Sequence, residues 1–205
     1  MPSQQTSTSL LSRVRNPADH EAWLEFDRRY RGLLLSYCRR RGVQHVDSED
    51  LVQKVLTNLT TTLTQFAYDP QRGRFRDYLY GSAKNAISEW AARPNRHWQP
   101  LVPDDTAAER PGGSASDPDS ALWEQEWVAH HYRLALETVR RTFDARSVEI
   151  FDRSVAGAKV ADLAREYGMS EQAVHKVRQR IRDRMEELIA QQVREEDDVD
   201  GSSSA

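Results

Sequence analysis

The chain has 205 residues, of which 38% are hydrophobic and 30% charged, and its formal net charge is −3. This length allows one or two small domains, each with its own core. Cys38 is the only cysteine, which excludes an intrachain disulfide and favours a reducing cytoplasm. No apolar run approaches the ~18 residues that span a bilayer, and the polar N-terminus lacks the apolar segment of a signal peptide, so no membrane insertion is expected.

The pattern along the chain predicts an all-α fold with two helical modules. Residues 1–9 are polar, and disorder is expected there. Helical periodicity runs over 10–93 and again over 120–193. Between them, residues 94–119 hold five prolines and a Gly-Gly pair, which is typical of a flexible linker. The acidic tail, 194–205, has low complexity and is also expected to be disordered.

The first strong helical stripe follows Asp47, which precedes an acidic turn and is expected to cap the helix. The apolar positions of this helix are Val52, Val55, Leu56, Leu59 and Leu63. Its other side carries Asp50, Gln53, Lys54, Thr57 and Asn58. From this segment alone, a solvated face is the better interpretation of those polar side chains.

A second helix follows a loop that contains Asp69, Pro70 and Gly73. The residues predicted to face inward are Phe75, Leu79, Ala83, Ala86, Ile87 and Trp90. Another face presents Arg76, Tyr80 and Lys84 at i, i+4 and i+8. Rings beside cations suit single-stranded nucleic acid, because bases stack on rings while cations track phosphates. A place in the core is an equal alternative for Tyr68 and Tyr80.

The segment 155–185 is typical of a helix-turn-helix. One apolar stripe consists of Val160, Leu163, Ala164 and Tyr167, and a second consists of Val174, Val177, Ile181, Met185 and Leu188. Between them, Gly168 stands where a helix end favours a left-handed residue, and Ser170 is placed to cap the next helix, with Glu171 in its first turn. The second helix of this motif enters the major groove of duplex DNA.

The charge of that second helix favours DNA over a solvated helical hairpin, which is the competing interpretation. Lys176 and four arginines between Ser170 and Met185 face only Glu171 and Asp183. A net charge of +3 on one helix is typical of phosphate contact.

Three segments, DSEDLVQKVLTNL, FRDYLYGSAKNAISEWAAR and LAREYGMSEQAVHKVRQRIRDRM, occur in this order with a linker before the third. Together they resemble the bacterial RNA polymerase sigma factors of the extracytoplasmic-function (ECF) subfamily. The resemblance implies sigma region 2 over 10–93 and sigma region 4, a winged-helix-like helix-turn-helix, over 120–193.

The resemblance also implies partners and site residues. Region 2 of the family docks on the clamp helices of the largest subunit of core RNA polymerase, and the matching positions are Asp50, Leu51, Gln53 and Lys54. It also reads the −10 promoter element as a single strand, and the matching positions are Tyr68, Asp69, Arg74, Arg76, Tyr80, Lys84 and Asn85. Region 4 reads the −35 element as duplex, and the matching positions are Ser170, Gln172, Ala173, His175, Lys176, Gln179 and Arg180. Promoter DNA is thus a second partner, and an anti-sigma factor is a further candidate.

Nothing in the sequence indicates an enzyme. It has no GxxxxGK[ST] phosphate loop, no HExxH and no CxxC motif, and no catalytic residue, metal ligand or cofactor is expected. Glu126 and His130 are four residues apart on a predicted helix, but two ligands do not make a closed metal site, so a surface pair is expected.

The sequence therefore predicts an alternative sigma factor that binds core polymerase in the cytoplasm and directs transcription initiation. The alternative is a helix-turn-helix regulator that is not a polymerase subunit, which would bind DNA by itself, usually as a dimer at a palindrome.

Overall fold

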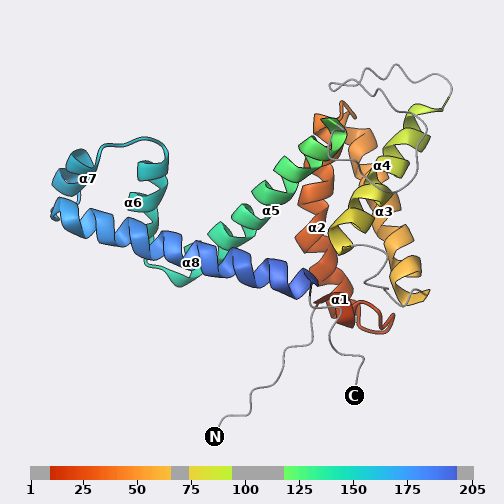
Figure 1. Cartoon of the computed structure of the whole chain (residues 1–205), viewed down its shortest axis with the longest axis horizontal. Coiled ribbons are helices and arrows are strands. Elements are labelled where there is room, and N and C mark those ends of the chain that lie inside the picture. The colour runs from red at the N-terminus through yellow and green to blue at the C-terminus, as the bar shows by residue number, and fades with distance from the viewer. Residues whose placement is uncertain (1–9, 66–73, 94–117, 198–205) are drawn as a thin grey trace, which may run out of the picture. The chain divides into compact units, whose positions relative to one another are not determined.

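A computed structural model of the chain describes residues 10–65, 74–93 and 118–197. Within these ranges all regular structure is α-helical, as the sequence predicts (Figure 1). The chain forms two compact units, one containing residues up to His130 together with those from Arg194 onward, and the other containing 131–193. The expected disorder of 1–9 and most of the expected linker lie outside the described residues, so the domain boundaries stay a prediction.

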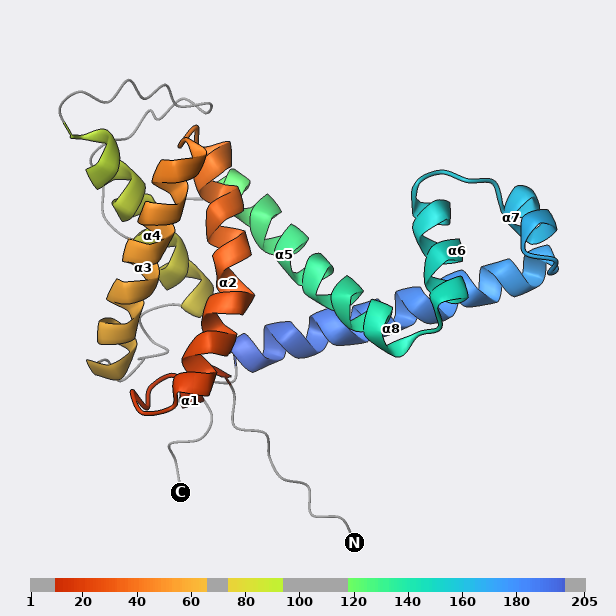
Figure 2. The same ribbon diagram turned by 180° about the vertical axis from the view of Figure 1, so that it is seen from behind.

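The first unit is built on α2 (His20–Arg40), which contacts α1 (Leu10–Arg13), α3 (His45–Gln65) and α4 (Phe75–Ala91). Figures 1 and 2 show α2, α3 and α4 side by side from opposite directions. The large side chains of α2 that are almost fully buried in this core are Phe26, Tyr30, Leu33, Leu34 and Tyr37. These positions recur at three- and four-residue intervals, so one continuous stripe of α2 holds the unit together.

The apolar stripes predicted for α3 and α4 are confirmed, since every residue of both is buried. The start of α3 is not as predicted: the helix begins at His45, so Asp47 lies in its first turn and is not the cap. The hydroxyl of the buried Ser48 donates to the carbonyl oxygens of Val43 and Gln44 at 3.2 and 2.9 Å. The Ser48 side chain thus holds the first turn of α3 to the two residues that precede the helix.

The beginning of α5 (Pro118–Thr142) belongs to the core of the first unit. Leu122, Trp123 and Trp127 are buried in the same apolar cluster as the stripes of α2, α3 and α4. The helical period of this segment was evident in the sequence, but the period does not reveal which core receives the stripe.

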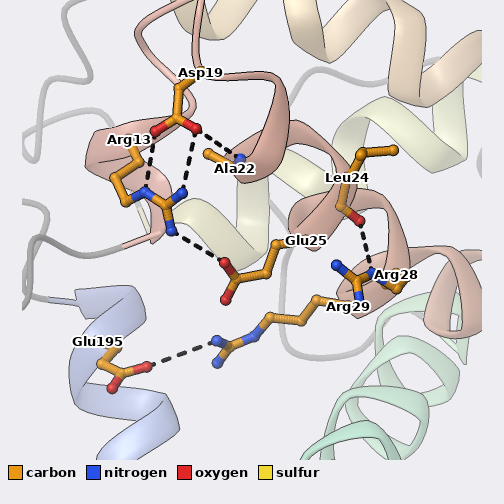
Figure 3. A network of polar contacts seen from close by, with 8 residues as sticks. All are labelled: Arg13, Asp19, Ala22, Leu24, Glu25, Arg28, Arg29 and Glu195. Atoms are coloured by element: carbon orange, nitrogen blue, oxygen red, sulfur yellow. Dashed lines mark hydrogen bonds and ion pairs between the residues drawn. The ribbon is translucent and has the colours of Figure 1, made fainter.

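The last turn of α8 (Glu171–Asp197) also belongs to the first unit. Glu196, only 6% exposed, accepts a hydrogen bond from the Tyr30 hydroxyl at 2.7 Å. Arg29 forms ion pairs with Glu195 at 3.7 Å, drawn in Figure 3, and with Glu196 at 3.4 Å. Burial and the neighbouring carboxylate raise the pKa of Tyr30 well above its usual value. The first four residues of the tail for which disorder was expected are therefore helical, and the side chains of Glu195 and Glu196 have partners on α2.

The second unit contains the rest of α5, α6 (Ala145–Val155), α7 (Val160–Glu166) and α8 up to Val193. One cluster packs α5, α6 and α8 together through Ala135, Val139, Val148, Phe151, Ile181, Met185 and Leu188. A second cluster packs α6, α7 and the start of α8 together through Ile150, Leu163, Ala164 and Val174. Val160, Tyr167 and Val177 are partly buried against them, so both stripes predicted for the helix-turn-helix are confirmed. No helix in the described ranges is both long and apolar enough to cross a membrane.

The turn between α7 and α8 is expected to depend on Gly168, whose φ is +59°. An L-residue in this region costs about 1–2 kcal/mol, so we expect Gly168→Ala to lower the free energy of unfolding of the second unit by roughly 1 kcal/mol. Gly81→Ala is the matched control, because Gly81 lies within α4 and an added Cβ meets nothing within 4 Å. It should raise stability by about 0.5–1 kcal/mol. Urea unfolding followed by circular dichroism measures both, and equal stability of Gly168→Ala and wild type would contradict the expectation.

The start of α2 is expected to be sensitive to acid through Asp19, which caps the helix by accepting from the Ala22 amide at 2.9 Å. Arg13 donates to both carboxylate oxygens, at 3.1 and 3.2 Å, and forms an ion pair with Glu25 at 3.1 Å (Figure 3). The hydrogen bond from Arg13 has the largest effect and the one from the Ala22 amide the second largest, and both lower the pKa of Asp19. The pKa of Asp19 is lower in the folded chain than its unfolded value of 3.8, so the ionised carboxylate stabilises the fold at pH values above 3.8. This stabilisation is lost as the pH falls through the pKa of Asp19 in the folded chain.

Asp19→Asn keeps a capping side chain but removes the charge that holds Arg13. The urea midpoint of the variant should lie below that of wild type at pH 6, and the difference should narrow as the pH is lowered to 3.5. A difference that stays constant over this pH range would exclude the ionised Asp19 as its origin.

Candidate nucleic-acid interface

The helix-turn-helix places the start of α8 on the surface of the second unit. The Ser170 hydroxyl accepts a hydrogen bond from the Ala173 amide at 3.1 Å, which confirms the predicted cap. Lys159 is the residue before α7 and makes no capping bond with its side chain. Two cation–π contacts, from Arg146 and Arg153 at 5.8 Å each, hold the Tyr167 ring at the end of α7. The turn between α7 and α8 is thus held by side-chain contacts on both sides.

Six of the seven residues predicted to read duplex are exposed, and Ala173 is half-buried. An open depression on α8 is lined by Gln172, His175, Lys176, Arg178, Gln179 and Arg182. Arg178 and Arg182 were not among the predicted site residues. Both follow His175 at i+3 and i+7, so helical spacing would have placed them on the same face.

Besides Ser170, two of the predicted side chains already have partners within the second unit. Gln179 donates to Asp183 at 2.6 Å and accepts from Arg182 at 3.2 Å. Arg180 lies over the Phe143 ring at 5.2 Å, donates to the Ser147 hydroxyl at 3.4 Å and lies 3.9 Å from the Asp144 carboxylate. Arg180 therefore contacts the start of α6, and Lys176 is the simpler candidate for a base contact.

In the first unit, the predicted strand-reading residues lie along α4, apart from Tyr68 and Asp69, which fall outside the described residues. Arg74, the residue before α4, and Asn85 are exposed, whereas Arg76, Tyr80 and Lys84 are half-buried. The ammonium of Lys84 lies 5.8 Å from the centre of the Tyr80 ring. We call Arg74, Arg76, Tyr80, Lys84 and Asn85 the strand face.

The beginning of α5 contacts this strand face directly. The indole of Trp123 lies 5.6 Å from the Tyr80 ring with their planes tilted by 33°, and the Tyr37 ring lies 6.1 Å from Tyr80. Arg76 forms an ion pair with Glu124 and lies 5.7 Å from the centre of the Trp127 ring. Burial lowers the pKa of the Arg76 guanidinium. Tyr80 thus packs against the core while its ring stays partly exposed, so its predicted role in reading a strand stays a prediction.

Two further arginines, at the end of α2, are paired with the same segment of α5. Arg41 and Asp119 form an ion pair in which each side chain is only 3% exposed, and the Tyr37 hydroxyl donates to Asp119 at 3.0 Å. Arg40 donates to Glu126 at 2.8 Å and to Gln125 at 3.0 Å.

The expectation of a surface pair at Glu126 and His130 is wrong, because these side chains are 4% and 3% exposed. Glu126 binds Arg40, and the His130 ring packs 5.6 Å from Tyr30 and 6.2 Å from Trp127. A residue on a polar helix can be buried when a neighbouring element supplies its counter-ion, which sequence spacing does not reveal.

The residues predicted to dock on polymerase lie on α3. Asp50 and Gln53 are exposed, and Gln53 accepts a hydrogen bond from Arg31 at 2.9 Å. Lys54 is paired with Glu89 of α4. Leu51 is 4% exposed and lies in the core, so the accessible members of this surface are Asp50, Gln53 and Lys54.

No group of three or more His, Cys, Asp or Glu side chains in the described ranges could hold a metal ion. Cys38 is buried, which raises the pKa of its thiol to about 12 and keeps it in the unreactive protonated form. The side chains gathered at the two surfaces are cations, amides and rings, which suit binding to phosphates and bases.

Residues 26–97 match the family model described as Sigma-70 region 2, which covers less than half of the chain. No curated protein matches the chain. The solved structure of CnrH in complex with the cytosolic domain of CnrY is similar at 20% sequence identity, covering 89% of this chain and 96% of that chain, with a TM-score of 0.35. A likeness this weak carries no argument about function. The segment that contains α3 and α4 is thus similar to sigma-70 region 2.

Proposed function

We propose that the chain is an alternative sigma factor, of the ECF type, which binds core RNA polymerase in the cytoplasm and directs it to promoters. The observation that carries the proposal is the match of residues 26–97 to sigma-70 region 2. Within this segment, Asp50, Gln53 and Lys54 of α3 are the candidate contacts with the clamp helices of the largest subunit. The strand face of α4 is the candidate reader of the melted −10 element.

The second unit supports the proposal through the chemistry of α8. Its first turns present exposed amide and basic side chains beside a capped helix N-terminus. Such side chains bind base edges in the major groove, as reading of a −35 duplex requires. In this proposal the polymerase supplies catalysis, and the chain supplies recognition of two promoter elements by two different chemistries. The accessible surface of α3 leaves room for an anti-sigma factor as a competing partner.

The proposal predicts that the purified chain forms a stable complex with core polymerase and starts transcripts at defined positions. Size-exclusion chromatography of the mixture tests the complex, and sequencing the 5′ ends of transcripts made from fragmented genomic DNA maps the starts. Core polymerase alone is the control. Absence of co-elution, together with dimeric binding of the chain to palindromic duplex, would instead support the helix-turn-helix regulator.

Lys176→Ala tests duplex reading by α8. If the ammonium contacts a base edge, the variant should bind promoter duplex in the presence of core polymerase about 1–3 kcal/mol more weakly at fixed salt. Arg133→Ala is the control, since Arg133 is exposed on α5, outside the α8 depression, and has no ion pair among the described residues. An equal loss in both variants would indicate an effect of total charge, and no loss in Lys176→Ala would remove it from the site.

A further inference from the structure

The beginning of α5 brings acidic side chains to a basic surface. Residues 118–130 contain Asp119, Glu124 and Glu126 and no lysine or arginine. Each of these carboxylates is paired with an arginine of the first unit: Asp119 with Arg41, Glu124 with Arg76 and Glu126 with Arg40. We call 118–130 the acidic cover.

The aromatic side chains of the cover lie where a stacked base would contact the strand face. Trp123 packs on Tyr80, whose ring is the predicted stacking platform. Trp127 packs under Arg76, the cation one helical turn before Tyr80. A strand that binds this face needs Arg76 and Tyr80 as well, because it brings phosphates to the guanidinium and base rings to the tyrosine.

From this overlap we propose that the acidic cover is an intramolecular competitor of single-stranded nucleic acid, with carboxylates in place of phosphates and indoles in place of bases. The proposal rests on the proposed function, because it concerns regulation of the face assigned to the −10 strand. While the cover is in place, Trp123 occupies the side of the Tyr80 ring that it contacts, and a base stacks there only after residues 118–130 leave α4.

The chemistry of the contact suits release. Arg41 and Asp119 are buried together, so separation from α2 rehydrates both charges at once and offsets the lost attraction between them. The indole nitrogen of Trp123 and one carboxylate oxygen of Glu126 are buried without a hydrogen-bond partner among the described residues. Both atoms gain hydrogen bonds to water when the cover leaves. The apolar burial of Leu122, Trp123 and Trp127 opposes release.

The double variant Glu124→Gln/Glu126→Gln tests the proposal, because it keeps the shape of both side chains and removes two of the three charge pairs. The probe is a 12-nucleotide fluorescein-labelled single strand of random sequence, and fluorescence anisotropy gives the dissociation constant for the full chain without polymerase. When the strand face is covered most of the time, its apparent affinity for the strand equals its intrinsic affinity multiplied by the fraction of molecules in which it is uncovered. We expect the variant to bind the strand at least about fivefold more tightly than wild type.

The control is Glu21→Gln/Glu137→Gln, which makes the same change of charge at two exposed positions that have no ion pair among the described residues. It should bind as wild type does. The single variant Glu124→Gln keeps the test available if the double variant does not fold, because the Glu124 side chain is 55% exposed. It should increase the affinity for the strand by a smaller factor than the double variant does. In addition, amide hydrogen exchange in 118–130 should accelerate when the strand is added, with no change in α6.

The proposal would be contradicted if the double variant and wild type bound the single strand with equal affinity, or if the control variant gained as much affinity as the double variant. Absence of strand binding by every variant would also overturn it. Mapping of transcript starts with core polymerase tests the proposed function separately. If only the proposal about the acidic cover is wrong, the wild-type chain still starts transcripts at defined positions.

Discussion

The packing of the first unit depends on the aromatic contact between α2 and the beginning of α5. Tyr37 lies at its centre, with Trp123 at 5.1 Å in an edge-to-face arrangement and its hydroxyl bound to the buried Asp119. Full burial of one large apolar side chain contributes about 1.5–3 kcal/mol, so Trp123 and Trp127 together contribute several kcal/mol. Without this contact, α2 and α4 would expose the apolar and basic surface that residues 118–130 now cover.

Sequence periodicity predicted the helices well because their stripes are long and regular. Every apolar residue predicted for α4 is buried, and the turn before α8 has both the left-handed Gly168 and the Ser170 cap. These features depend on local chemistry, namely the spacing of side chains on one helix and the conformations open to a few residues.

The features that the sequence missed depend on partners distant along the chain. Glu126 is buried because Arg40 of α2 meets it, and Glu196 because Tyr30 and Arg29 do. The same limit affects the candidate site. A count of charges found the basic α8 and the cations of α4, but it could not reveal that Arg180 contacts α6 or that Arg76 contacts Glu124.

The two candidate surfaces differ in how much must change before they bind. On α8, Lys176 and His175 are exposed, and the bonds of Gln179 and Arg182 lie within the same helix, so duplex can approach without a rearrangement of helices. On α4, Tyr80 and Arg76 are held by side chains of another helix. If both surfaces bind promoter DNA, duplex contact therefore has the lower barrier and comes first. Strand contact then follows when phosphates close to the first unit, at high local concentration, compete with the carboxylates of the cover.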